Sequence, residues 1–374
     1  MMISNIKILI FPIDMEESRK FILTMKSLNI DVFGASSVVN STDILNIDKI
    51  IELPFITDQC FDLKLYETLS SYAISHIFTP HVGVWLYLDK LGKAFPERYH
   101  FQLCQPSPFT QSWQEFEFSY DWANKQHLSS FVGDIENKKN IKNNPPLSVG
   151  QITSLHRQFL QIPGQCDTQK LSALMQILRM VPDGDLVEVG VYFGRSAFVI
   201  AWLAQQYNLG NLICIDPWEN SKIEDQGDSA SILPNNLSQE SGGIDFEKVF
   251  QGFVSVMSLL SNVSYIKDVS QEGIKHYKES SKAGLISTPE FGTISLSGKI
   301  AMIHIDGNHR YDLVREDIRA WEPLVIVDGW ILIDDYVWAF GDGPKKAGDE
   351  LLATGRFDVS FCLGNTLFLR KSQM

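Results

Sequence analysis

Short apolar runs alternate with amphipathic segments through the first third of the chain. Four of the runs are rich in β-branched or aromatic residues and have the length of buried strands: residues 6–11, 30–33, 49–53 and 76–79. Three other segments carry apolar side chains at helical spacing: residues 15–28, 63–74 and 82–91. Strands that alternate with helices in this way predict a parallel sheet covered by helices.

The same alternation returns in the C-terminal half. Apolar runs typical of strands occupy residues 186–189, 211–215, 263–266, 300–305 and 330–333. Helical spacing marks residues 149–160, 168–180, 196–206, 313–321 and 345–352. We therefore expect an α/β protein whose C-terminal part is a doubly wound, mostly parallel sheet.

A polar segment separates the two patterned regions. Residues 133–146 read GDIENKKNIKNNPP, a composition that buries too little apolar surface to fold on its own. Domain boundaries tend to fall in such segments, and a length of 374 residues agrees with two domains. We predict a smaller N-terminal α/β domain at residues 1–132, a linker at 133–147 and a larger domain at 148–374.

The N-terminal region lacks a recognisable ligand loop. After its first strand the chain reads Phe11-Pro12-Ile13-Asp14, without the glycines that let a backbone approach a phosphate. The order of elements is similar to that of the small Rossmann-like domain that precedes ATP-grasp domains, although no ATP-grasp pattern follows. This favours an accessory, docking or oligomerisation role over a separate small-molecule site, and we expect a homo-oligomer.

Composition and charge narrow the possible functions. Hydrophobic residues make up 44% and charged residues 21%, as in folded globular proteins, and 32 Lys+Arg against 45 Asp+Glu give a net charge of −13. This acidic balance argues against a protein that grips a nucleic-acid backbone. The five cysteines are sparse and odd in number, which favours a reducing cytoplasmic location over a disulfide framework. We expect neither a signal peptide nor a membrane span.

The turn after the first C-terminal strand carries candidate cofactor chemistry. Glu188 lies at the end of the strand, and Gly190, Tyr192, Gly194 and Ser196 follow in the pattern ExGxxxGxS before a helix. In doubly wound sheets ligands bind outside the carboxyl ends of the strands, and glycines allow a close approach of the backbone. The spacing differs from GxGxxG and resembles motif I of class I S-adenosylmethionine (SAM) methyltransferases. The alternative is a tight strand–helix turn without a ligand.

Two later strand ends extend this candidate cofactor site. Asp216 ends the second strand and is placed to accept hydrogen bonds from ribose hydroxyls, with a turn or helix N-cap as the alternative role. Trp218 either covers the cofactor or substrate or belongs to the core. The methyltransferase resemblance implies that Asp268 and Val269, which follow the third strand, contact adenine.

Three carboxylates follow two strands that we expect to be neighbours in the sheet. Asp306 follows the strand at residues 300–305, and Asp334 and Asp335 follow the strand at 330–333. Carboxylates gathered at one sheet edge repel one another unless a cation joins them. Oxygen ligands suit a hard cation, Mg²⁺ before transition metals. In the alternative to a metal site, Asp306 is a turn residue and the pair of Asp334 and Asp335 is a helix N-cap.

The segments IDGNHRYDLVREDIRAWEPL and GWILIDDY resemble the metal-dependent sugar O-methyltransferases of antibiotic biosynthesis, of the macrocin and mycinamicin type. The resemblance covers about residues 180–370. It implies that Asp306, Asp334 and Asp335 hold Mg²⁺ and that His309 is the general base. It also implies a small-molecule, sugar-containing acceptor in a glycosylated natural product or a surface glycan.

The reaction expected from these features is Mg²⁺-assisted transfer of a methyl group from SAM to a hydroxyl. SAM is already activated, so the enzyme must mainly align the acceptor and deprotonate it. Mg²⁺ lowers the pKa of a bound hydroxyl, which makes Asp306 and His309 the candidate catalytic residues. Two alternatives stay open: a metal-independent N- or C-methyltransferase, and a non-catalytic binding or assembly protein with a SAM-type fold.

Three further features have uncertain roles in the sequence. His304 lies inside a strand and is interpreted as structural. The polar residues 219–243 are either a mobile lid or an insertion without a role. The aromatic-rich residues 105–132 either pack between the domains or form part of a substrate wall.

Overall fold

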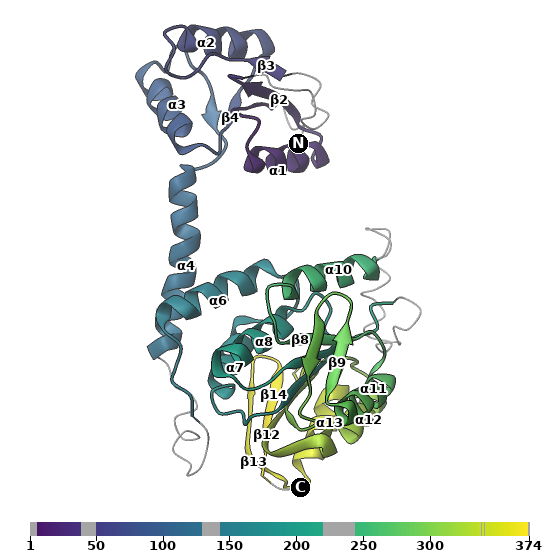
Figure 1. Cartoon of the computed structure of the whole chain (residues 1–374). Coiled ribbons are helices and arrows are strands. Elements are labelled where there is room, and N and C mark those ends of the chain that lie inside the picture. Colours follow the sequence, from purple (N-terminus) through teal and green to yellow (C-terminus); the bar gives the residue numbers. More distant parts are fainter. Residues whose placement is uncertain are drawn as a thin grey trace. The chain divides into compact units, whose positions relative to one another are not determined.

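The computed structural model of the chain divides into two compact units, Met1–Phe118 and Ser119–Met374 (Figure 1). It describes residues 6–38, 50–128, 143–219, 244–337, 339 and 341–372. The division falls inside helix α4 (Pro108–Leu128), earlier in the chain than the linker predicted at 133–147. The residues outside this description include 133–142 of that linker, 220–243 of the segment interpreted as a lid or an insertion at 219–243, and Lys49 of a predicted strand.

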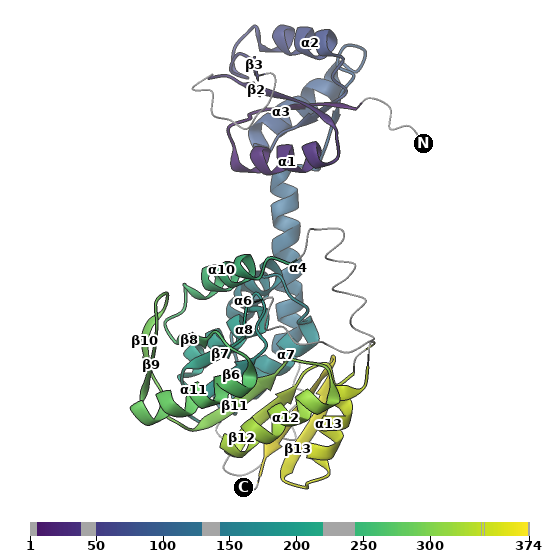
Figure 2. The same ribbon diagram turned by 90° about the vertical axis from the view of Figure 1, so that its right-hand side faces the viewer.

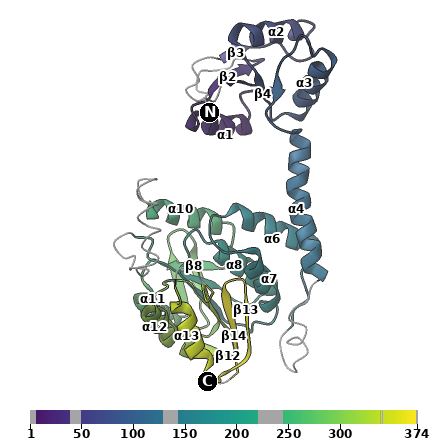
Figure 3. The ribbon, with the colours of Figure 1, turned by 180° about the vertical axis from the view of Figure 1, so that it is seen from behind.

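The first unit is a parallel sheet of five strands in the order β3-β2-β1-β4-β5. Its strands are β1 (Lys7–Ile10), β2 (Asp31–Ser36), β3 (Ile50–Glu52), β4 (His76–Phe78) and β5 (Gln102–Leu103). Its connecting helices are α1 (Glu16–Ser27), α2 (Phe61–Tyr72) and α3 (Val82–Ala94) (Figure 3). The predicted parallel α/β unit is confirmed, and among its described strands the sequence analysis missed only β5, whose two residues are too few to show a period.

Helix α4 covers most of the aromatic-rich segment at 105–132. Its last turns belong to the second unit, where Trp122 stacks on His156 with ring centroids 4.2 Å apart. The Ser119 hydroxyl contacts Nδ1 of the same histidine at 3.0 Å, and burial lowers the pKa of His156 to about 4. A neutral imidazole packed against an indole is a structural arrangement, so this end of the segment packs within the second unit.

The second unit is built on a sheet of seven strands in the order β13-β14-β12-β11-β6-β7-β8. The strands are β6 (Asp185–Val189), β7 (Leu212–Ile215), β8 (Val263–Ile266), β11 (Ile300–Ile305), β12 (Val325–Ile333), β13 (Phe357–Leu363) and β14 (Thr366–Lys371). All neighbours pair in parallel except β14, which is antiparallel to both β12 and β13. The predicted doubly wound, mostly parallel sheet is therefore confirmed.

Helices cover both faces of this sheet (Figure 2). The helices are α6 (Val149–Gln161), α7 (Thr168–Ile177), α8 (Arg195–Tyr207), α10 (Phe246–Met257), α11 (Ser270–Ala283), α12 (Tyr311–Trp321) and α13 (Gly343–Leu352). Side chains alternate along each strand: Leu186 of β6 joins the buried cluster of α6, α7, α8 and α10, whereas Val187 and Val189 join that of α11, α12 and α13. Glu188 therefore points towards the α8 side.

The strand order reverses between β6 and β11, which are hydrogen-bonded neighbours. In open α/β sheets, ligands bind outside the carboxyl ends of the strands at such a point. The sequence analysis did not predict α10, α11, the hairpin β9 (Leu285–Thr288) and β10 (Gly292–Ser295), or the C-terminal hairpin of β13 and β14. Within the described ranges, no helix is both long and apolar enough to cross a membrane.

Candidate active site

A cavity of about 440 Å³ lies at the carboxyl ends of the strands in the second unit. This volume is within the range of about 300–1,000 Å³ typical of small-molecule sites. Ten of the predicted site residues line it: Gly190, Tyr192, Ser196, Asp216, Asp268, Val269, Asp306, His309, Asp334 and Asp335. The other three, Glu188, Gly194 and Trp218, are not among its lining residues. The two groups of residues proposed for cofactor and metal thus share one cavity.

Asp216 fixes the glycine loop that follows β6. Its Oδ2 accepts hydrogen bonds from the backbone N–H groups of Val191 at 2.8 Å and Tyr192 at 3.0 Å, and its Oδ1 accepts one from Trp218 N–H at 2.9 Å. Burial raises the pKa of Asp216, although these three amides act in the opposite direction. Each carboxylate oxygen has two lone pairs, so Asp216 can hold the loop and still accept a ribose hydroxyl.

Two aromatic residues of the loop region have left-handed backbone conformations. Tyr192 has φ of 54° and Trp218 has φ of 40°, values that are rare for bulky residues. The Trp218 indole N–H donates to the Tyr192 carbonyl at 2.9 Å, and both backbone N–H groups are held by Asp216. Such conformations persist only where the surroundings determine them strongly, and they cluster at functional sites.

Glu188 and Trp218 differ from the cofactor-contacting roles expected from the sequence. Glu188 is fully buried on the α8 side of β6, where its Oε1 accepts hydrogen bonds from Ser196 at 2.6 Å and His304 Nδ1 at 2.7 Å. The strand alternation turns it away from the cavity. Trp218 is 2% exposed and packs against Phe253 of α10, which is the core role left open above.

The remaining predicted cofactor residues have identifiable local roles. Gly194 is the N-cap of α8 with φ of 85°, and a Cβ there would lie 3.1 Å from Phe253. Asp268 accepts a hydrogen bond from the Val269 N–H at 2.9 Å, and Val269 is the N-cap of α11. Asp268 and Val269 line the cavity at the end of β8, on the opposite side of β6 from β11.

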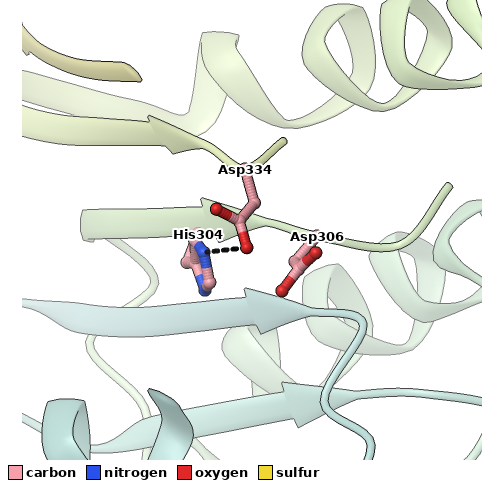
Figure 4. Close-up of side chains that lie close together, drawn as sticks. All are labelled: His304, Asp306 and Asp334. Carbon is pink, nitrogen blue, oxygen red and sulfur yellow. Dashed lines mark ion pairs between the residues drawn. The ribbon is translucent and has the colours of Figure 1, made fainter. Parts of the chain in front are cut away.

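The acidic residues gather at the ends of β11 and β12. Figure 4 shows the side chains of His304, Asp306 and Asp334 pointing towards one another. Each of these three places a donor atom within 4.8 Å of the other two, and the same holds for the set of Asp306, His309 and Asp335. Asp306 belongs to both sets. Burial, reinforced by the negative charge of Asp334, holds the pKa of Asp306 well above its usual range.

Asp334 has a lysine partner that the sequence analysis missed. The ammonium group of Lys170, from the first turn of α7, forms a buried ion pair with Oδ2 of Asp334. The hydroxyl of Thr366, from β14, donates to Oδ1, and His304 Nε2 lies 3.9 Å from Oδ2. Burial, the largest influence, would raise the pKa of Asp334, but the Lys170 ammonium, His304 and the hydrogen bonds from Asp306 and Lys170 together outweigh it and hold that pKa below its usual range.

Asp335 orients His309. Its Oδ2 accepts a hydrogen bond from His309 Nε2 at 2.6 Å, and its Oδ1 accepts one from the Asn365 side-chain amide at 2.5 Å. Asp335 has φ of 49°, a left-handed conformation immediately after the end of β12. Because a carboxylate only accepts hydrogen bonds, Nε2 of His309 is the nitrogen that donates to Asp335.

Comparison with known proteins adds the family. Residues 187–336 match a model described as a methyltransferase domain, and no curated protein sequence matches the chain. Among solved structures, the chain is similar to the O-methyltransferase NovP (16% identity, 69% of this chain and 100% of that one, TM-score 0.38). It is also similar to the calicheamicin methyltransferase CalS11 (13%, 68% and 91%, TM-score 0.38) and to the MycE methyltransferase of the mycinamycin pathway (16%, 62% and 56%, TM-score 0.35).

The matched region contains most of the residues that line the cavity. It runs from β6 and the glycine loop to the acidic pair after β12. The strand order, the loop after the central strand and the family model agree with one another. The C-terminal part of the chain carries a class I SAM-dependent methyltransferase domain.

Proposed function

We propose that this domain transfers a methyl group from SAM to a hydroxyl group of a sugar-containing small molecule, with Mg²⁺ held beside the acceptor. The observation that carries the proposal is that Asp306, Asp334, Asp335 and His309 line the same cavity as the glycine loop. The sugar acceptor and its natural-product context are the most specific parts of the proposal. They come from the resemblance of the segments IDGNHRY and DDY to sugar O-methyltransferases.

The donor set fits Mg²⁺. Three carboxylates offer the oxygen ligands that this hard cation prefers. In one set a donor oxygen of Asp306 lies within 4.8 Å of one of Asp334, and in the other set it lies within 4.8 Å of one of Asp335. The hydrogen bonds to Asp334 and Asp335 occupy one lone pair of each oxygen and leave the second. Asp306, Asp334 and Asp335 are therefore the residues that would hold it.

The chain's own residues supply alignment and a base. When bound, Mg²⁺ would lower the pKa of an acceptor hydroxyl and fix its position. His309 would accept the hydroxyl proton at Nδ1, while the Nε2–H bond to Asp335 keeps the ring in the required tautomer. The loop after β6 brings the Gly190 backbone to the wall of the cavity, where a cofactor could approach the strand ends.

Removal of the metal tests the metal-assisted reaction directly. Methyl transfer from radiolabelled SAM to a panel of nucleotide-linked sugars and glycosylated small molecules is measured with added Mg²⁺ and with EDTA. We expect EDTA to lower the rate by about a hundredfold or more, since Lewis-acid activation contributes several kcal/mol. Full activity in EDTA would instead support the metal-independent alternative, and methylation of amines but not hydroxyls would contradict an O-methyltransferase.

Replacement of the proposed base gives a second test. In His309→Gln we expect kcat to fall by about 10²–10⁴-fold, the usual contribution of a positioned general base. SAM affinity should stay close to that of the wild type, because His309 follows β11 and not β6. The matched control is Arg310→Gln, which alters an exposed residue that pairs with Asp312 in the same segment. Equal, near-wild-type turnover in both variants would remove His309 as the base.

A further inference from the structure

Lys170 is a buried cation at the candidate metal site. Its side chain is 1% exposed, and lysine is almost never fully buried unless it is paired. Its partner is Asp334, whose carboxylate is 6% exposed and is one of the three proposed Mg²⁺ ligands. Lys170 is not among the residues that line the cavity, so its ammonium approaches the carboxylate from the protein side.

The position of Lys170 is fixed by its helix. The side chain of Asp167, the N-cap of α7, accepts a hydrogen bond from the Lys170 backbone N–H at 2.7 Å. Arg195 of α8 donates to the carbonyls of Ile162 at 2.5 Å and Cys166 at 3.2 Å, which holds the segment just before α7. The hydrogen bonds made by Asp167 and by Arg195 are all part-buried, so the Lys170 ammonium has little freedom to leave Asp334.

The charges around the ammonium are mostly negative. Asp334 is in contact with it, Asp306 acts on it from a greater distance, and the neutral Cys166 thiol lies nearby. The fourth neighbour, His304, approaches the same Asp334 oxygen and is itself hydrogen-bonded to Glu188. When all three carboxyl groups are ionised, as metal binding would require, three carboxylates and one ammonium leave two net negative charges if His309 is neutral. One divalent cation balances that charge.

We propose that Lys170 is a permanent second cation of this centre, which neutralises Asp334 when the metal is absent and thereby weakens Mg²⁺ binding to a reversible level. The proposal rests on the metal-assisted function proposed above. Two positive groups that share one carboxylate repel each other, and at the short distances of this cluster the repulsion stays appreciable even with strong dielectric screening. Without Lys170, the metal would meet three carboxylates that lack a fixed counter-charge.

Magnesium affinity of charge-altered variants tests the proposal. The full-length wild type, Lys170→Gln and Lys170→Arg are titrated with Mg²⁺ by isothermal calorimetry in the absence of SAM and acceptor. Glutamine keeps a hydrogen-bond donor for Asp334 and removes the charge, so we expect its Mg²⁺ Kd to be about tenfold or more lower than that of the wild type. Arginine keeps the charge, and its Kd should stay within about threefold of the wild-type value.

The possible outcomes separate this proposal from the proposed function. Binding in the wild type with an equal or higher Kd in Lys170→Gln would overturn the role of Lys170 and leave the metal site intact. Absence of Mg²⁺ binding in both proteins would overturn the metal site and this proposal together. Binding in Lys170→Gln alone would mean that the ammonium excludes the metal from the wild type, which would overturn both the reversible binding proposed here and the metal-assisted reaction.

Loss of a buried cation also affects folding, which offers a second readout. An uncompensated buried carboxylate is strongly destabilising, so Lys170→Gln should have a lower melting temperature than the wild type in EDTA. Because a ligand that binds only the folded state stabilises it, Mg²⁺ should raise the melting temperature of this variant more than that of the wild type. If the variant is unfolded in EDTA, circular dichroism should show that Mg²⁺ restores its fold. The proposal would be contradicted if Mg²⁺ neither raised the melting temperature of the variant more than that of the wild type nor restored its fold.

Discussion

Asp306→Asn is expected to lower kcat/KM for methyl transfer by about a thousandfold or more and to abolish measurable Mg²⁺ binding. Asp306 is the residue common to both donor sets at the ends of β11 and β12. Asparagine keeps the shape of the side chain but removes its charge, and a neutral amide is a weak ligand for Mg²⁺ beside a carboxylate. Losing several kcal/mol of Lewis-acid activation corresponds to a rate change of this size.

The same variant discriminates between the metal-assisted and metal-independent alternatives. Burial raises the pKa of Asp306, so without a metal its carboxyl group favours the neutral form, which asparagine imitates. A metal-independent enzyme should therefore tolerate Asp306→Asn with little loss of rate. A large loss that is accompanied by loss of Mg²⁺ binding would support the metal-assisted reaction.

The measurements for Asp306→Asn are steady-state kinetics, Mg²⁺ calorimetry and binding of S-adenosylhomocysteine. The affinity for S-adenosylhomocysteine should change by no more than a few fold, because the cofactor loop follows β6 whereas Asp306 follows β11. Asp312→Asn is the matched control, since Asp312 lies in the first turn of the following helix α12 and is exposed. If Asp306→Asn and its control bind Mg²⁺ with the same affinity, Asp306 is not a ligand.

The acidic edge of the sheet is well predicted by the sequence, for a physical reason. Strand β11 and the last four residues of β12, 330–333, are mostly apolar runs that are followed directly by Asp306 and Asp334. Strands that are buried on both faces have this composition. In the doubly wound order, β11 and β12 are neighbours in the sheet. Residues that follow such strands must therefore meet, even though 28 positions separate these two in the chain.

The partners of these acids are not predicted, because no local pattern connects them. Lys170 precedes Asp334 by 164 positions, and Thr366 follows it by 32. A signal for Lys170 does exist: it shares a helical face with Leu174 and Ile177, both buried, where a charged residue needs a partner. The sequence indicates that such a partner is required but does not identify it.

Glu188 illustrates a prediction that strand geometry could have sharpened. Its neighbours Val187 and Val189 face α11, α12 and α13, so alternation along β6 turns the Glu188 side chain to the opposite face. There it joins Ser196 of α8 and His304 of β11 in a buried network. The motif position was recognised from its spacing, whereas the direction of the side chain depends on the pleat of the strand.

Gly190→Ala is expected to destabilise the second unit by about 3 kcal/mol or more, through overpacking and backbone strain together. A Cβ at Gly190 would lie 2.1 Å from the Asp306 carbonyl oxygen and 2.7 Å from the Gly307 Cα. The neighbouring backbone cannot withdraw easily, since Gly190 N–H donates to Ile215 at 2.9 Å and Asp306 N–H donates to Val189 at 2.8 Å. The end of β11 would have to move away from β6.

The consequence for function follows from the same contact. Displacing Asp306 from β6 would shift the residue that both donor sets share, so affinities for Mg²⁺ and S-adenosylhomocysteine should fall together in Gly190→Ala. Differential scanning calorimetry is the primary measurement, with an expected drop in melting temperature of about 6–12 °C for a domain of this size. Calorimetric titration of both ligands at a temperature where the variant is folded is the second.

A second glycine provides a control that isolates the close approach. Gly284, the C-cap of α11, has φ of 75°, close to the 80° of Gly190, but no heavy atom lies within 4 Å of the position of its Cβ. Gly284→Ala therefore incurs only the backbone strain, about 1 kcal/mol, and should leave ligand binding unchanged. The difference between the two variants measures how tightly the glycine loop is packed against β11. Equal destabilisation would mean that the loop and the acidic strand end can separate at little cost, and that the cofactor and metal regions are not mechanically joined.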